Sequence, residues 1–446
     1  MVPSYKLLLA IIRLKLYSDS DKTRKCRSNP TGRGVELHEP TSALLSDFRL
    51  YMHIDLSEIR LAQTALAPHL PVTPLTHTEA LSLKVGREVF IKWDNKFRTG
   101  SFKERGALYF LLNLKQQHPS SQVCTASAGN HALAVSWHSR QLKIPCTIFM
   151  PKFAPLVKVQ KAIQNGANVE LIGNTFDETY LYAQEQAKKL NLTFVPGFDH
   201  PHIIAGQGVS GLEIYDSVGE HISGVVVPIG GGGLAAGIAL AVKSLNPRIF
   251  VLGVRTNWTL KDATNTMFPQ APIADGIAVK RIGIANQPLL DQYVDKIVHV
   301  DEATIGTAII DYLHCERVVV EGAGAASWAA LLEDHLPKKV KSVVILASGS
   351  NIDLNVLGRL IRRSQFELGQ LLRVTVSVPD RPGSLARLTE CLSNEQANIL
   401  ETFHERGCID VPGNVEVTFL LEIRGPDHKQ AILDTLTALG LKPTEH

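Results

Sequence analysis

The chain has 446 residues, of which 45% are hydrophobic and 20% are charged, and its formal net charge is +3. This composition is typical of a soluble globular protein with two or three domains, and it excludes a disordered chain. The small net charge gives no support for nucleic-acid binding, and no apolar run is long enough to span a bilayer. The six cysteines are scattered without a CxxC pair, so we expect a reducing compartment and neither a zinc site nor a disulfide framework.

The first 51 residues differ in composition from the chain that follows them. Up to Arg33 they contain eight Lys or Arg residues, against the two aspartates Asp19 and Asp21. An organellar transit peptide and an unstructured extension are both open interpretations. The aspartates favour the extension, as does Met52, which stands directly before the first clear helix. We therefore expect a cytoplasmic protein, with an organellar location as the alternative.

Strands and helices are predicted to alternate along the body of the chain. Apolar residues three or four apart, from Ile59 to Leu70, predict a first amphipathic helix from Ser57, capped by Asp55 or by Ser57 itself. A strand over residues 89–93 precedes a polar stretch, and a helix follows over residues 105–114. Later strands are predicted at residues 123–126, 146–150, 168–172, 225–229, 249–254, 297–300 and 343–346, with helices at 130–141, 155–165, 176–190 and 234–245. Strands this apolar are buried on both faces, so the predicted fold class is α/β with largely parallel sheets.

Lys103 lies at the turn where the strand over residues 89–93 gives way to a helix. A lysine in this place can be a solvated cation, an anion ligand or a nucleophilic amine for imine chemistry. Taken alone, the solvated cation is favoured, because most lysines are on the surface. Parallel sheets bind ligands at the carboxyl ends of their strands, so the loops after the later strands decide between these interpretations.

A run of four glycines, Gly230 to Gly233, follows one strand and precedes a helix that begins near Leu234. Successive glycines are costly to order, and they are most useful where backbone amides must approach a ligand closely. A strand, a glycine loop and a helix N-terminus form a cradle for an anion such as phosphate. The run has neither a Lys-Ser/Thr ending nor GxGxxG spacing, so a Walker loop and a dinucleotide site are not predicted.

Two further strand-end loops are polar: residues 127–131 and residues 348–351. Each has a plain structural alternative, as a helix cap and as a turn respectively. A lysine, a phosphate cradle and polar strand-end loops together match a phosphorylated carbonyl cofactor held as a Schiff base. That description fits pyridoxal 5′-phosphate (PLP), whose ring withdraws electrons while the protein selects the bond that breaks.

Six motifs carry a resemblance to a known family. They are TGSFKERGA at 99–107, SAGNHA at 127–132, FD at 198–199 with GQG at 206–208, PIGGGGL at 228–234, ADGIAV at 274–279 and EGAGAA at 321–326. In this order and spacing they resemble the threonine dehydratase (threonine ammonia-lyase) family, which is a fold-type II, tryptophan synthase β-like PLP family. The resemblance runs from about Asp55 to the C-terminus.

The resemblance implies a role for each motif. Lys103 would hold the cofactor and then take the α-proton of the substrate, which requires a pKa lowered towards neutrality. Asn130 would hydrogen-bond the 3′-oxygen of the cofactor, and Ser348 would face its pyridine nitrogen. The remaining cofactor-binding residues are expected to be Phe102, Gly230, Gly231, Gly232, Gly233 and Leu234. The substrate-binding residues are expected to be Ser127, Ala128, Gly129, Asn130 and His131.

The expected reaction is elimination of water from threonine, and from serine, to give 2-oxobutanoate or pyruvate with ammonia. Alternatives are a related lyase acting on 3-hydroxyaspartate, a serine racemase, and a non-catalytic amino-acid sensor. Serine racemases of this fold look to have a serine where this chain has Ala128, and that serine returns a proton to the substrate. Alanine cannot donate a proton. Elimination is therefore favoured, while Lys103 and the intact glycine run argue against a sensor.

Three departures from the family pattern affect the ligands. Arg255 and Lys261 stand near places where cation-binding relatives have carboxylates, so no divalent metal site is predicted. Leu133 and Ser350 stand where the family usually has Gln and Gly. These two changes bear on the identity of the substrate rather than on the reaction class.

The pattern changes after a helical connector at residues 361–371. Residues 372–446 are predicted to form a βαββαβ unit with a very short last strand, which resembles an ACT regulatory domain. Residues 52–360 would be the catalytic domain, with a smaller lobe at about 94–192. The resemblance implies a homodimer or homotetramer and an amino-acid effector such as isoleucine, and a purely structural dimerisation module is the alternative. The expected regulatory residues are Asp380, Pro382, Gly383, Leu385, Asn398 and Ile399.

Overall fold

The computed structural model describes residues 54–258, 272–406 and 412–446. The predicted extension over residues 1–51 lies outside these ranges, as does Lys261. In the ranges that are described, no helix combines the length and the apolar character needed to cross a membrane.

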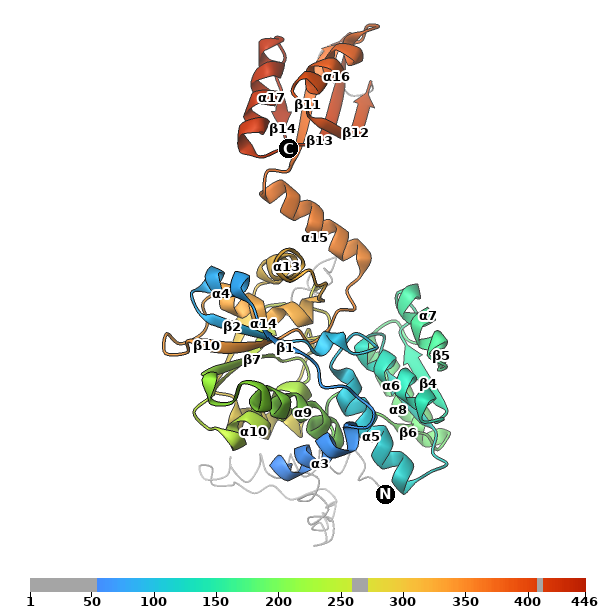
Figure 1. The fold of residues 1–446 in the computed structure, drawn as a ribbon. Helices are drawn as coiled ribbons and strands as arrows, with labels where there is room; N and C mark the ends of the chain where they lie inside the picture. The colour runs from blue at the N-terminus through green and yellow to red at the C-terminus, as the bar shows by residue number, and fades with distance from the viewer. Residues whose placement is uncertain (1–53, 259–271, 407–411) are drawn as a thin grey trace, which may run out of the picture. The chain divides into compact units, whose positions relative to one another are not determined.

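The larger of two parallel sheets organises the catalytic body (Figure 1). Its strands, in spatial order, are β1 (Leu75–His77), β2 (Glu88–Lys92), β10 (Ser342–Leu346), β7 (Gly224–Pro228), β8 (Phe250–Thr256) and β9 (Lys296–Val300). Every neighbouring pair is parallel except β1 and β2. The carboxyl ends of β2, β7 and β10 therefore meet at one edge, and each precedes a loop that the sequence singles out.

Helices cover both faces of this sheet, as the apolar strands require. One core contains residues of β7 together with α3 (Leu56–Leu66), α9 (Pro201–Val218), α10 (Gly233–Leu245) and α12 (Asn286–Tyr293). The other core contains residues of α4 (Glu79–Val85), α13 (Glu302–Asp311), α14 (Gly322–Leu332) and α15 (Leu354–Glu367).

The smaller sheet is parallel throughout, in the order β5-β4-β3-β6. Its strands are β3 (Val123–Ala126), β4 (Cys146–Met150), β5 (Asn168–Leu171) and β6 (Thr193–Phe194). One face packs on α5 (Lys103–Gln117), α6 (Asn130–Gln141) and α7 (Leu156–Gln164), and the other on α8 (Phe176–Lys189).

Helices α5 and α9 approach each other closely through two glycines. A Cβ added to Gly206 would lie 2.7 Å from the Cα of Gly106, and one added to Gly106 would lie 2.9 Å from the carbonyl oxygen of Ile203. Real side chains do not tolerate such distances, so both positions need glycine for the helices to meet. This crossing joins the helix that begins at Lys103 to the larger sheet.

The C-terminal unit is a four-stranded antiparallel sheet, in the order β12-β13-β11-β14. Its elements, in chain order, are β11 (Leu371–Pro379), α16 (Ser384–Asn394), β12 (Asn398–Glu405), β13 (Asn414–Glu422), α17 (Pro426–Ala438) and β14 (Thr444–Glu445). The predicted βαββαβ order and the short last strand are confirmed.

Some predicted boundaries were wrong. The first helix ends at Leu66 rather than continuing to Leu70; Asp55 caps its start by accepting a 2.8 Å hydrogen bond from the Ser57 amide. Helix α15 begins at Leu354, several residues before the predicted connector, because Asp353 caps it. Helix α5 begins at Lys103 rather than Arg105, so Lys103 is part of the helix and not of the preceding turn.

Candidate active site

The turn before Lys103 is bound to the end of β10. The Phe102 amide donates to the Ser348 carbonyl at 3.0 Å, and Ser101 forms an isolated β-bridge with Gly349. No side chain caps α5 at Phe102. The start of this helix is therefore held by backbone contacts with the loop at 348–351.

The Lys103 side chain is directed into the protein. Its Nζ donates to the Gly197 carbonyl at 2.6 Å and lies 5.0 Å from the centre of the Phe102 ring. Burial lowers the pKa of Lys103 to about 8, and the Glu321 carboxylate partly offsets this effect. An amine with this pKa exchanges a proton near neutral pH, as the proposed chemistry requires.

Glu321 and Asn351 hold the side chain of Asn130 from two sides. Asn130 Nδ2 donates to Glu321 Oε1 at 2.6 Å, and Asn130 Oδ1 accepts from Asn351 Nδ2 at 2.6 Å. Glu321 Oε2 accepts from the Asn351 amide at 3.1 Å. Burial, followed by the charge of Asp275, raises the pKa of Glu321 to about 7. The orientation of the Asn130 amide is thus set, and its Nδ2 retains a second N–H for a ligand.

The Ser348 hydroxyl is buried and has no hydrogen-bond partner among the described residues. Buried polar atoms are normally paired, so an orphaned hydroxyl beside the Lys103 turn indicates a missing ligand. A pyridine nitrogen is a suitable acceptor for this O–H group. This observation fits the group that the sequence predicts.

The glycine run lies between β7 and α10. Gly232 is the N-cap residue, with φ of +98°, and α10 begins at Gly233. The first amides of a helix have no partner within it and face an anion placed at its N-terminus. A Cβ on Gly231 would overlap the Phe198 ring, and one on Gly233 would lie 2.8 Å from the Phe198 carbonyl oxygen. Glycine is therefore needed at both positions for close packing against Phe198, and the run with Leu234 presents the free amides of the α10 N-terminus, which suit a phosphate.

The loop over residues 127–129 and the start of α6 are the predicted site of the substrate carboxylate, and they directly follow β3. Ser127 Oγ accepts from the Gly129 amide at 3.2 Å. The His131 ring is turned inward, with Nε2 3.1 Å from the Val195 carbonyl oxygen. Burial, followed by the charge of Lys103, lowers the pKa of His131 to about 3, so this imidazole is neutral. A charged histidine is therefore not available to a carboxylate, whereas the first amides of α6 are.

The structure also locates the three departures from the family pattern. Ser350 Oγ donates to the Gly100 carbonyl at 3.3 Å, which directs its hydroxyl to the Lys103 turn. Leu133 lines a surface pocket together with Trp137 and Arg98. Arg255 donates to the Val279 carbonyl at 2.8 Å. In the described part of the chain, no group of three or more His, Cys, Asp or Glu side chains could hold a metal ion.

The expected regulatory residues belong to the C-terminal unit. Asp380, Pro382 and Gly383 form the turn between β11 and α16, where Gly383 has φ of +93°. Leu385 is exposed, and Asn398 donates to Glu422 at 2.9 Å. Ile399 is half-buried beside Asn398 on β12.

Sequence reasoning assigned no role to three contributors to this site. Glu321 is part of a quoted motif, but its carboxyl gave no separate signal. Asn351 lies in a quoted loop, and its partner Asn130 is 221 residues away in the chain. Gly197 contributes only a backbone carbonyl, which no residue pattern reveals.

Comparison with known proteins identifies the class. The family described as "Pyridoxal-phosphate dependent enzyme" matches residues 66–349, so the fold and site are those of a PLP-dependent enzyme. The L-threonine ammonia-lyase of Thermotoga maritima is 40% identical over 395 residues, covering 87% of this chain and 98% of that protein. The L-threonine ammonia-lyase of Geobacter sulfurreducens is 37% identical over 390 residues, covering 86% of this chain and 97% of that protein.

A solved structure agrees with these relatives. The processed form of threonine deaminase isoform 2 from Solanum lycopersicum has a TM-score of 0.62 and 32% identity, covering 70% of this chain and 95% of that chain. The chain belongs to the threonine ammonia-lyase family of PLP-dependent enzymes. The predicted family, fold type and cofactor are confirmed.

Proposed function

We propose that this chain catalyses the PLP-dependent deamination of threonine, and of serine, to a 2-oxo acid and ammonia. The observation that carries this proposal is that a half-buried Lys103, with its pKa lowered to about 8, and an unpaired Ser348 hydroxyl lie on adjoining segments, which are joined by the Phe102 amide and the Ser348 carbonyl. The printed names of the relatives, L-threonine ammonia-lyase and threonine deaminase, support the same substrate.

The residues that would hold the cofactor are Lys103, Asn130, Ser348 and the glycine run with Leu234, with Phe102 beside the lysine. When bound, PLP supplies an electron sink that stabilises negative charge at the substrate α-carbon. Ser348 would present a neutral hydroxyl rather than a carboxylate to the pyridine nitrogen. A hydroxyl in this place would not hold that nitrogen protonated, so Ser348 would favour elimination of the β-hydroxyl.

Lys103 is the base that we assign to the substrate α-proton. The Gly197 carbonyl accepts one N–H of its ammonium group and so fixes the direction in which Nζ points. Burial lowers the pKa of Lys103 and so favours the neutral amine, which has the lone pair that proton removal needs. Ala128 has no group that could return a proton, so elimination is favoured over racemisation.

The substrate carboxylate is assigned to the loop over residues 127–129 and the first amides of α6. A helix N-terminus attracts an anion through its free N–H groups and its dipole. Because His131 is neutral and bound to Val195, its contribution would come from its backbone amide. Ser127, Ala128, Gly129 and Asn130 complete this set.

Partners and regulation belong to the same proposal. We propose a cytoplasmic homodimer or homotetramer whose C-terminal unit acts as an ACT domain for an amino-acid effector. The βαββαβ order supports the ACT assignment, and the turn with Asp380, Pro382, Gly383 and Leu385 is the proposed effector site, together with Asn398 and Ile399. Calorimetry with isoleucine tests it, and a titration without heat would contradict it.

The catalytic proposal is tested by release of 2-oxo acid from threonine, serine and 3-hydroxyaspartate. We expect the highest kcat/KM for threonine, and a higher value for 3-hydroxyaspartate would assign the chain to another lyase. Lys103→Ala should abolish release and remove the visible absorption band of the bound cofactor. The control is Lys84→Ala. Lys84 is a partly exposed lysine on α4 that forms an ion pair with Asp311.

A further inference from the structure

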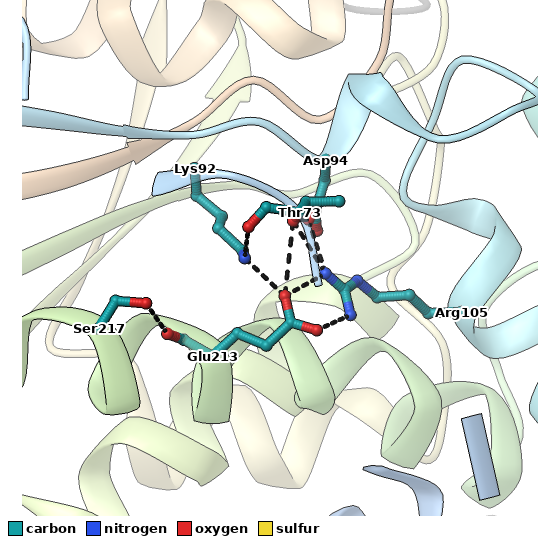
Figure 2. Close-up of polar contacts among 6 residues, drawn as sticks. All are labelled: Thr73, Lys92, Asp94, Arg105, Glu213 and Ser217. Carbon is teal, nitrogen blue, oxygen red and sulfur yellow. Dashed lines mark hydrogen bonds and ion pairs between the residues drawn. The ribbon is translucent and has the colours of Figure 1, made fainter. Parts of the chain in front are cut away.

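A buried cluster of charged residues lies behind the turn that carries Lys103. Figure 2 shows Lys92, Asp94 and Arg105 pointing toward Glu213, with Thr73 between them. These five side chains are each at most 6% exposed. Two cations and two carboxylates make the cluster neutral overall, which is the condition under which buried charges are tolerated.

Arg105 is the centre of this cluster. Its Nη1 donates to Glu213 Oε1 at 2.7 Å, and its Nη2 donates to Glu213 Oε2 at 2.6 Å, which is a two-point ion pair. Nη2 also donates to Asp94 Oδ1 at 2.9 Å and to Thr73 Oγ1 at 3.1 Å. The guanidinium lies 4.8 Å from the centre of the Phe97 ring. A planar group held at so many points cannot rotate freely.

The cluster joins the two ends of the segment from Asp94 to Arg105, which contains Lys103 and is called the Lys103 segment below. Asp94 begins the 3-10 helix Asp94–Lys96, just before the loop that leads to Lys103, and Arg105 lies two residues after Lys103. The Arg105–Asp94 ion pair therefore joins the two ends of this segment. Lys92, the last residue of β2, donates to Glu213 at 2.5 Å and to the Thr73 carbonyl at 2.7 Å. These bonds fix the base of the segment to the larger sheet and to α9.

Arg105 also restrains the rotation of α5. Residues two apart on an α-helix are related by a rotation of about 200° about its axis, so Arg105 and Lys103 lie on nearly opposite sides of the first turn. The Gly106–Gly206 contact sets the distance between α5 and α9, and the packed side chains of residues 107–111 hold the body of the helix. The two-point ion pair with Glu213 on α9 adds a restraint at the first turn itself. Rotation of this turn would move Lys103 Nζ away from the Gly197 carbonyl.

We propose that Arg105 is a positioning residue for Lys103, and that its contacts with Glu213 and Asp94 hold the lysine amine at its place in the site. This inference rests on the proposed function for its kinetic test. Arg105 does not face the substrate, and it acts only through the helix turn it shares with Lys103.

The test compares Arg105→Lys with Asp94→Asn in the full-length holoenzyme. Arg105→Lys keeps the charge but loses the two-point geometry, so we expect kcat for threonine to fall about 100-fold, with KM little changed, because small misplacements of a reacting group have effects of this size. Asp94→Asn weakens the ion pair that joins the two ends of the segment but changes no residue of α5. We expect kcat for threonine to fall about tenfold. In both variants the visible circular dichroism of the bound cofactor, which reports its orientation, should fall by more than half.

The matched control is Arg87→Lys. The Arg87 guanidinium is also largely buried and donates to the carbonyls of Pro337, Val340 and Leu336, but it lies at the start of β2, away from Lys103. This variant should lower the melting temperature while kcat and the cofactor signal stay unchanged.

The outcomes are separable. Wild-type kcat and cofactor dichroism in folded Arg105→Lys would overturn the proposal, and Asp94→Asn decides in the same way if Arg105→Lys does not fold. An equal loss in Arg87→Lys would show a general effect of stability and would also overturn it. If the wild-type enzyme does not deaminate threonine, the proposed function fails, while the dichroism still tests the positioning role.

Discussion

Replacing Glu321 by glutamine should change how the stability of the cofactor-free protein depends on pH. The Glu321 side chain is 6% exposed. Burial, followed by the charge of Asp275, raises its pKa from 4.5 to about 7. A carboxyl whose pKa is raised in the folded state binds its proton more tightly there than in the unfolded chain. The stability this gives is fully present below pH 4.5 and is lost as the pH rises through 7.

The size of the effect follows from the two pKa values. The difference between 4.5 and about 7 corresponds to about 3 kcal/mol in the free energy of unfolding. Glutamine is neutral throughout and cannot show this loss. Between pH 4.5 and pH 8 the variant should therefore gain about 3 kcal/mol of stability relative to the parent chain.

Urea unfolding of both chains at several pH values measures this difference directly. Glu88→Gln is the control, because it makes the same change at an exposed position on β2. A stability difference that stays constant between pH 4.5 and pH 8 would refute the reasoning. Glutamine presents an N–H group where a carboxylate oxygen accepts from Asn130 or from the Asn351 amide. The same variant should therefore lose at least tenfold in deamination activity, as when one oriented polar contact in an active site is removed.

Three further outcomes are expected. Gly231→Ala should lower both the melting temperature and the affinity for PLP, because the added Cβ would overlap Phe198. Gly358→Ala on α15 should change neither, because nothing lies within 4 Å of the added Cβ. Calorimetry measures the melting temperature, and cofactor titration measures the affinity. Ala128→Ser should add a proton donor beside the substrate loop, and chiral chromatography of residual serine should then detect D-serine that the parent chain does not form. Removal of divalent cations by EDTA should leave kcat unchanged, because the resemblance puts the Arg255 guanidinium, itself a cation, near the place where cation-binding relatives have a carboxylate; a loss restored by Mg²⁺ would contradict this.

Much of the fold could be predicted because local patterns agree with the tertiary structure. The helix at Asn130–Gln141 and the strands at Val123–Ala126 and Cys146–Met150 have the predicted bounds. The boundary errors have local causes, since Asp353 caps α15 early and α5 begins at Lys103 without a side-chain cap.

The candidate site was less predictable, because its side chains are oriented by partners far away in sequence. Asn130 was identified from its motif, but the carboxyl that orients it belongs to Glu321, 191 residues later. His131 was predicted as a substrate-binding residue, and the position of its ring is set by Val195, 64 residues away. Ser350 was identified as a departure from the family pattern, and only the structure shows that its hydroxyl donates to Gly100, 250 residues earlier. Only the folded chain brings these groups together.

The two sides of the first turn of α5 show why burial alone does not decide the charge of a residue. Burial lowers the pKa of Arg105, but the charges of Asp94 and Glu213 outweigh it, so the pKa is raised and the guanidinium stays charged. Burial lowers the pKa of Lys103 as well, and there the Glu321 carboxylate offsets it only in part. A fixed charge suits a group that holds a helix in place, and an amine near its pKa suits a group that must take up and release a proton. Two paired carboxylates thus keep the guanidinium charged, while the single Glu321 carboxylate leaves the Lys103 amine able to exchange a proton.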